Sequence, residues 1–152
     1  MSRVHILVDS STKGSKNSKY GESTAFWAVF LGESSKMPSQ VGMIYRNREG
    51  PNKMFYIGVI YALEDFIHAH FNKCDVEVRG DCLPVINQLC KKWSVNELKP
   101  FYDLVKNLEK QLVEEKQCKI KYGHISDDDS LYYKIDQCAK GIFELLKKNG
   151  LR

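Results

Sequence analysis

The sequence lacks any long apolar run. No segment approaches the roughly 18 apolar residues of a transmembrane helix. Residues 1–5 lead directly into a strand-like segment, without the apolar stretch of a signal peptide. We therefore expect a protein of the cytoplasm or nucleus that has no membrane partner.

The cysteines also lack the spacing of a known disulfide or zinc-binding motif. There are five of them, no two form a CxxC pair, and the histidines do not lie at ligand spacing from them. An odd, unpatterned set argues against a disulfide scaffold and against structural zinc. We expect reduced thiols, as in an intracellular protein.

A strong charge of either sign is absent as well. The net charge of +4 permits a polyanionic partner but does not require one, so function has to be argued from a site. The chain has 152 residues, of which 43% are apolar and 28% charged, and it contains no linker, repeat or low-complexity segment. These values predict one domain over residues 1–152, which we expect to be a monomer.

The apolar periodicity predicts elements in the order β-β-β-α-β-α-α-β-α. Strands are expected at residues 4–9, 24–31, 40–46, 74–79 and 118–122, and helices at residues 52–70, 83–92, 99–115 and 131–148. The first three strands should form an antiparallel meander, and helical crossovers should add two parallel strands. The predicted fold is therefore α/β, with a five-stranded mixed sheet and helices on both faces.

Three aspartates lie where a metal site would need them. Asp9 ends the first strand, Asp81 follows the fourth, and Asp136 lies in the first turns of the last helix. If the first and fourth strands are neighbours, Asp9 and Asp81 meet at the carboxyl edge of the sheet. Clustered carboxylates repel one another unless a hard cation lies between them. The structural alternative is that Asp81 caps the following helix.

Several segments match, in order, those of a known family. The chain resembles the ribonuclease H family, in the compact form that lacks a basic protrusion. Residues 79–89 (RGDCLPVINQL) resemble its aspartate-serine-glutamine segment and the helix that follows. The match continues through Trp93, Asn96, residues 98–100 and Tyr102, and extends to residues 53–63, 123–124 and 135–139. It covers almost the whole chain.

The resemblance implies an endonuclease that hydrolyses the RNA strand of RNA–DNA hybrids. In the family, four acidic residues bind two Mg²⁺ ions, which Mn²⁺ can replace. By position, Asp9, Asp81 and Asp136 match three of these acids. His124 matches a catalytic loop histidine that assists proton transfer or product release. A lone histidine is otherwise more often structural.

The resemblance also implies contacts to an RNA–DNA hybrid or to double-stranded RNA. Asn52 matches a loop that contacts the minor groove of the hybrid. Lys13 and Lys16 suit phosphate contacts, although a basic loop is usually only solvated. The remaining candidates for nucleic-acid binding are Ser10 and Cys82. The family's hybrid-contacting glutamine is replaced by Leu83, which weakens the expectation of specificity for hybrids.

The fourth acid of the family is missing. Its position, one residue before Tyr56, is occupied by Phe55, and a phenyl ring cannot bind a hard cation. Glu64 lies nine residues further along the helix and should face away from the site. Two substitutes stay open, namely Glu49 and the loop acids Asp127, Asp128 and Asp129. Three adjacent acids in a loop are more often simply solvated.

Three functions remain as hypotheses. The first is a metal-dependent endonuclease with reduced activity, which the three aspartates favour. The second is an inactive domain that binds RNA or a hybrid. The third is a protein-interaction module that uses Trp93, Phe101 and Tyr102, unless these aromatic residues pack beneath the two middle helices.

Overall fold

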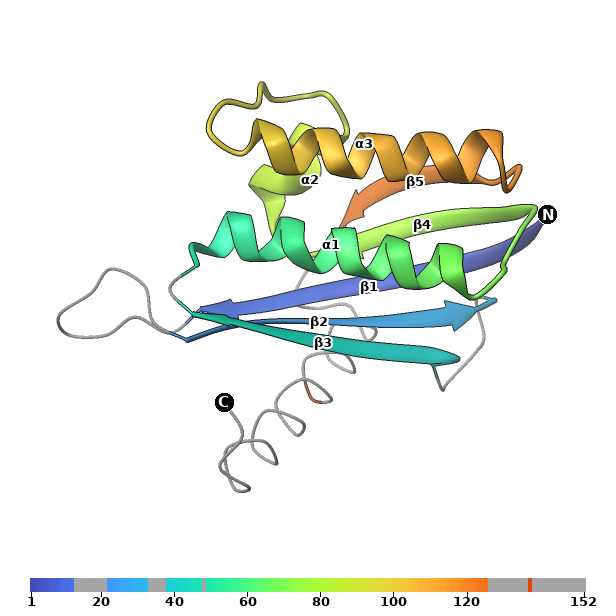
Figure 1. Cartoon of the computed structure of the whole chain (residues 1–152), viewed down its shortest axis with the longest axis horizontal. Coiled ribbons are helices and arrows are strands. Elements are labelled where there is room, and N and C mark those ends of the chain that lie inside the picture. Colours follow the sequence, from blue (N-terminus) through green and yellow to red (C-terminus); the bar gives the residue numbers. More distant parts are fainter. Residues whose placement is uncertain (13–21, 33–37, 48, 126–136, 138–152) are drawn as a thin grey trace, which may run out of the picture.

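The computed structural model describes residues 1–12, 22–32, 38–47, 49–125 and 137. Across these residues the chain forms a five-stranded sheet and three helices (Figure 1). The strands are β1 (Ser2–Thr12), β2 (Glu22–Leu31), β3 (Gln40–Asn47), β4 (Cys74–Gly80) and β5 (Lys119–His124). The helices are α1 (Pro51–His68), α2 (Leu83–Leu89) and α3 (Lys99–Glu114). These eight elements follow the predicted order, and the expected last helix lies outside the described residues.

The sheet has the strand order β3-β2-β1-β4-β5. The pairs β1–β2 and β2–β3 are antiparallel, whereas β4 is parallel to both β1 and β5. The predicted meander and the two added parallel strands are therefore confirmed. Most importantly for function, β1 and β4 are neighbours, so their carboxyl ends lie at the same edge of the sheet.

Several element boundaries differ from the prediction by a few residues, and two of these differences have a local reason. The first strand continues to Thr12, which pairs with Ser23 of β2, because ladder hydrogen bonds do not require apolar side chains. The helix expected to reach residue 92 ends at Leu89. Lys91 has a left-handed backbone conformation (φ 62°), which ends an α-helix.

The described helices lie on one face of the sheet, with α1 packed against both the sheet and α3 (Figure 1). Along β4 the alternation places Val76 and Val78 in the buried core beneath these helices, while Glu77 between them is partly exposed. The main core joins buried side chains of β1, β2 and β4 to those of all three helices. No helix in the described part of the chain combines the length and apolar character needed to cross a membrane.

The opposite face of the sheet carries a smaller apolar cluster. Leu7, Phe26, Ala28 and Phe30 alternate with the residues that face α1, and all four are buried together with Ile125. An apolar second face is what a sheet with helices on both faces requires. The last predicted helix, at residues 131–148, falls outside the described ranges apart from residue 137.

Helix α1 lies directly on the sheet at Gly58. A Cβ atom at this position would come within 2.9 Å of Cβ of Ala25 and of Cγ1 of Val8. Glycine in a helix interior costs about 1 kcal/mol relative to alanine, and close packing against β1 and β2 offsets that cost. This contact holds the first turns of α1 against the carboxyl end of β1.

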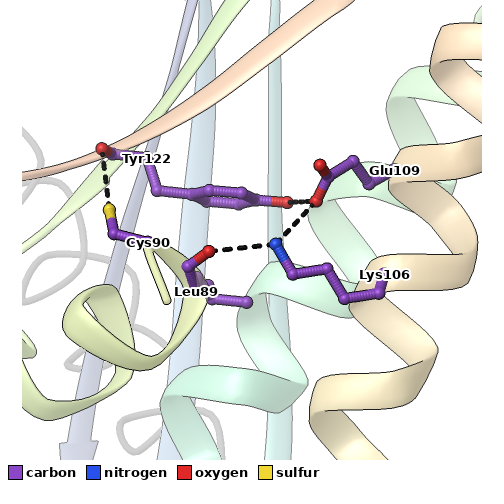
Figure 2. A network of polar contacts seen from close by, with 5 residues as sticks. All are labelled: Leu89, Cys90, Lys106, Glu109 and Tyr122. Atoms are coloured by element: carbon purple, nitrogen blue, oxygen red, sulfur yellow. Dashed lines mark hydrogen bonds and ion pairs between the residues drawn. The ribbon is translucent and has the colours of Figure 1, made fainter. Parts of the chain in front are cut away.

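A partly buried polar network joins α2 and α3 to β5 (Figure 2). The Tyr122 hydroxyl donates to Oε2 of Glu109 at 2.9 Å, and Nζ of Lys106 donates to the same oxygen at 3.0 Å and to the carbonyl of Leu89 at 2.9 Å. The Cys90 thiol donates to the Tyr122 carbonyl at 3.4 Å. Burial, with the nearby Glu109, raises the pKa of Tyr122, so its phenol remains a donor.

Removal of the Tyr122 hydroxyl should destabilise the protein. We expect Tyr122→Phe to lower the free energy of unfolding by about 1–3 kcal/mol, because the partly buried Glu109 carboxylate loses a donor. Urea denaturation followed by circular dichroism measures the change. The control is Tyr45→Phe on β3, whose stability should match that of the natural protein; equal losses in both variants would argue against a specific role for the network.

Candidate functional site

Asp9 and Asp81 come together at the carboxyl edge of the sheet. The last paired residues of β1 and β4 are Val8 and Gly80, and the two aspartates follow them directly. Asp9 is 8% exposed, and the backbone N–H of Ser10 donates to its Oδ1 at 3.0 Å. The predicted convergence of these two strand ends is therefore observed.

The helix-capping alternative for Asp81 does not hold. The residue at the N-cap position of α2 is Cys82, and Asp81 precedes it in the connection from β4. Asp81 is partly buried. Two carboxylates on adjacent strand ends repel each other, and a hard cation relieves this repulsion.

His124 lies at the same edge. It is the last residue of β5 and pairs with Gly80 of β4, which in turn pairs with Val8 of β1. Its side chain is exposed. The strand β5 runs two residues further than predicted, because the backbone of residue 125 also donates to the Gly80 carbonyl at 2.8 Å. The register therefore brings His124 into the row of strand ends that carries the aspartates.

Phe55 lies against this row from the side of α1. Its side chain is fully buried. A Cβ atom added to Gly80 would overlap the Phe55 ring and would lie 2.8 Å from the carbonyl oxygen of Val8. The ring thus fills the space above the last residue of β4, between the ends of the strands that lead into Asp9 and Asp81. On this side the site is apolar and closed to water.

The fit between Phe55 and Gly80 predicts a specific stability effect. We expect Gly80→Ala to lower the free energy of unfolding by about 2–3 kcal/mol, because the added methyl group forces the ring and α1 to move. Adding Phe55→Leu should recover part of the loss, which a double-mutant cycle in urea measures.

Gly123 on β5 provides the matched control for that experiment. A Cβ atom there would have ordinary contacts of 3.5 Å or longer, so Gly123→Ala should change stability by no more than about 0.5 kcal/mol.

The double-mutant cycle can also contradict the prediction. If the stability changes caused by Gly80→Ala and Phe55→Leu simply add, the two residues are not coupled.

Asn52 and Cys82, both predicted to contact nucleic acid, are in contact with each other. The Cys82 thiol donates to Oδ1 of Asn52 at 3.3 Å, which links the first turn of α1 to the start of α2. Burial raises the pKa of Cys82 to about 11, so the thiol is protonated and remains a donor at neutral pH. Since Oδ1 of Asn52 accepts this bond, the amide N–H groups point to the other side.

Glu49, one of the predicted substitutes for a fourth acid, is paired with a lysine. Its carboxylate forms an ion pair with Lys53 at 2.7 Å. Together they line a cavity of about 360 Å³ between β3, α1 and α3, along with Arg46 and Phe101. Glu64 lines the same cavity and is exposed, as expected from its helical phase. Within the described residues, no three histidine, cysteine, aspartate or glutamate side chains form a group that would hold a metal.

The other predicted site residues fall into two groups. Ser10 is on β1, partly buried beside Asp9. The rest lie outside the described residues, namely Lys13, Lys16, Asp136, Asp127, Asp128 and Asp129.

The exposure of Trp93 contradicts the prediction that this aromatic side chain packs in the interior. Its side chain is 50% exposed, whereas it was expected to pack beneath the two middle helices. It lies in the connection after α2, which ends three residues earlier than predicted, so Trp93 is not part of a helix face. Phe101 and Tyr102 are partly buried against the main core, as expected.

Two features of the site were not predicted. Gly80 is needed to accommodate the Phe55 ring, and Tyr56 donates to Oε1 of Gln88 at 2.6 Å, which ties α1 to α2. The resemblance placed Phe55 where the family has an acid, and a bulky residue there was a signal that a neighbour must be small. The glycine directly before Asp81 was the residue that this signal pointed to.

No protein-family model matches the sequence, and no curated protein sequence matches it. Solved structures do resemble it. RNase H1 from the halophilic archaeon Halobacterium salinarum NRC-1 is 24% identical, with a TM-score of 0.66 over 82% of this chain and 86% of that chain. The N-terminal RNase H domain of a Mycobacterium tuberculosis protein is 18% identical, with a TM-score of 0.71 over 93% and 99%.

A third similar structure contains nucleic acid. LC11-RNase H1, isolated from compost by a metagenomic approach, was solved in complex with an RNA/DNA hybrid. It is 18% identical, with a TM-score of 0.67 over 87% of this chain and 92% of that chain. The strand order and these matches show that the chain has the α/β ribonuclease H-like fold and is structurally similar to ribonuclease H1 domains.

Proposed function

We propose that this chain is a metal-dependent endonuclease of the ribonuclease H type that hydrolyses the RNA strand of RNA–DNA hybrids at a reduced rate. The observation that carries the proposal is the position of Asp9 and Asp81, which directly follow Val8 and Gly80, the last residues at which the adjacent parallel strands β1 and β4 pair. His124 ends the next strand in the same row and suits a role in proton transfer.

The donor set fits a hard divalent cation. Mg²⁺ is usually bound through one or two carboxylates and keeps several of its waters, which Asp9 and Asp81 would allow. Asp136, from the predicted last helix, would add a third carboxylate. When bound, Mg²⁺ or Mn²⁺ would activate a water and stabilise the leaving oxygen of the phosphodiester.

The residues beside the aspartates suit a nucleic-acid strand. The amide of Asn52 is oriented by Cys82 and can donate to a base edge or to a ribose 2′-hydroxyl, the group that distinguishes RNA from DNA. Ser10, Lys13 and Lys16 would contact phosphates. The hybrid bound to LC11-RNase H1 supports the choice of partner. The four described cysteines are free, which suits a reducing cytoplasm or nucleus.

Phe55 is the reason to expect a reduced rate. We infer that it occupies the position of the fourth acid, and a buried ring provides no ligand there. Glu49 is paired with Lys53 and is not positioned to compensate. The remaining carboxylates would hold a cation less firmly and neutralise less charge in the transition state.

The direct test is cleavage of a labelled RNA–DNA hybrid by the purified, folded chain in Mg²⁺ and in Mn²⁺. We expect slow cleavage of the RNA strand that EDTA stops. Double-stranded RNA and double-stranded DNA of the same sequence serve as substrate controls. If neither metal supports cleavage of the hybrid, the catalytic proposal fails.

The second candidate is a non-catalytic domain that binds RNA or a hybrid. The contact between Phe55 and Gly80 favours it, because a ring fitted so closely closes one side of the site. This function predicts hybrid binding that weakens as salt increases, since phosphate contacts release counterions, with no turnover. Fluorescence anisotropy across a salt series, run beside the cleavage assay, separates the two candidates.

A further inference from the structure

Two free cysteines lie side by side at the end of the sheet that is opposite to the aspartates. Cys74 is the first residue of β4, and Cys118 directly precedes β5. The register pairs the next residues, Asp75 and Lys119, so the two cysteines face each other across adjacent parallel strands. The backbone N–H of Cys74 donates to Sγ of Cys118 at 3.4 Å.

The turns that lead into the two cysteines are alike. Lys73 and Gln117, which directly precede them, both have left-handed backbone conformations, with φ of 52° and 55°. The backbone N–H of Lys73 donates to the carbonyl of Lys116 at 2.8 Å, which ties the two turns together. Non-glycine residues adopt this conformation only where the surroundings impose it. The backbone on either side of the pair is therefore held in place.

Each thiol is also oriented by a hydrogen bond of the same type. Sγ of Cys74 donates to the carbonyl of residue 72 at 3.2 Å, and Sγ of Cys118 donates to the carbonyl of residue 116 at 3.6 Å. Both side chains belong to the main core, on the side of the sheet that the helices cover. The two Cβ atoms thus project to the same side.

This arrangement meets the geometric requirement for a disulfide. Adjacent strands are separated by about 4.7–4.9 Å. A disulfide needs a Cα–Cα separation of about 4.4–6.8 Å and Cβ vectors that do not diverge. Rotation of the two thiols away from their carbonyl acceptors would suffice, without movement of the strands.

We propose that Cys74 and Cys118 are a redox-sensitive dithiol that closes to a disulfide between β4 and β5 when a peroxide reaches it. Cys74 lines a cavity of about 570 Å³ at this end of the sheet, together with Arg3 and His70, and this cavity gives a small oxidant access. No residue of the aspartate site takes part, so this inference is independent of the proposed function.

The chemistry balances with one peroxide per pair. The sulfur of one cysteine attacks a peroxide oxygen, the O–O bond breaks, and a sulfenic acid and one water form. The second sulfur then displaces the hydroxyl group as a second water and forms the S–S bond. Two thiols are oxidised by two electrons, and hydrogen peroxide is reduced to two waters.

The disulfide would join two residues that are 44 positions apart in the chain and would close a loop that contains α2 and α3. Such a crosslink restricts the unfolded chain, so the oxidised protein should melt about 5–15 °C higher than the reduced protein. Burial, with the adjacent Cys118 thiol, raises the pKa of Cys74. Because the thiolate is the reacting form, the oxidation rate should increase as the pH rises.

The experiment uses the full chain treated with hydrogen peroxide. We expect a product lighter by two hydrogen atoms, a peptide map that joins Cys74 to Cys118, a higher melting temperature, and reversal of all three by dithiothreitol. Cys74→Ser and Cys118→Ser should each prevent the mass loss, whereas Cys90→Ser, the matched control, should leave it unchanged.

Two results would overturn the inference. One is a peptide map in which the disulfide joins other cysteines. The other is a natural protein whose Cys82 or Cys90 is oxidised by peroxide while Cys74 and Cys118 stay reduced. Both are read from the natural chain, so they do not depend on the folding of any variant.

Discussion

Asp9→Asn should lower hybrid cleavage by about a thousandfold, equivalent to about 4 kcal/mol of transition-state stabilisation. The change replaces a carboxylate with a neutral amide of nearly the same shape at a position that is 8% exposed. Asparagine binds a hard divalent cation far less well than aspartate. The measurement is initial-rate cleavage of the labelled hybrid, with Mn²⁺ binding followed by calorimetry.

An exposed acid of the same type provides the control for Asp9. Asp103 lies on α3 and pairs with Lys99 at 3.2 Å on the surface. Asp103→Asn should therefore leave both cleavage and Mn²⁺ binding unchanged. Cleavage that survives Asp9→Asn at the natural rate would mean that the activity does not come from this site.

Phe55→Glu should increase hybrid cleavage by about tenfold to a thousandfold, because it would add a carboxylate beside Asp9 and Asp81. The variant should also be less stable than the natural protein without metal, since the charge enters a fully buried position. Added Mg²⁺ or Mn²⁺ should then raise its melting temperature more than that of the natural protein. Cleavage assays and thermal melts across a metal titration measure both effects.

Phe55→Gln is the matched control, because it has the shape of glutamate without its charge. It should show the loss of stability but neither the gain in cleavage nor the additional metal-dependent rise in melting temperature. If Phe55→Glu and Phe55→Gln behave alike, Phe55 does not stand at a position from which an acid can reach the cation. The thermal melts answer this question even if the natural protein has no activity.

The strand pattern could be predicted because it depends on local information. Alternating and apolar segments define strands, and the rule that crossovers are right-handed limits how they can be joined. From these facts, two parallel strands were expected beside the meander, and Asp9 and Asp81 were expected at one edge if the first and fourth strands were neighbours. The register of β1 with β4 confirms both expectations. What could not be predicted was the end of α2, because the left-handed conformation of Lys91 leaves no clear signal in the sequence.

The candidate site was predictable only in part, for a similar reason. The resemblance to the ribonuclease H family was enough to select Asn52, Cys82 and His124 as candidates. That the Cys82 thiol orients the amide of Asn52 depends on how α1 and α2 meet, which is a property of packing. The ion pair between Glu49 and Lys53 likewise depends on the folded structure and could not be predicted from the sequence.

The sequence by itself determined the α/β fold class and the identity of the residues at Asp9, Asp81 and Phe55. These follow from periodicity and from residue identity. Only the tertiary structure decided that the Phe55 ring is fitted against Gly80 and that Cys74 lies beside Cys118. Both contacts join residues that are distant in the chain, and their closeness is set by how α1 and the strands pack, which no local pattern encodes.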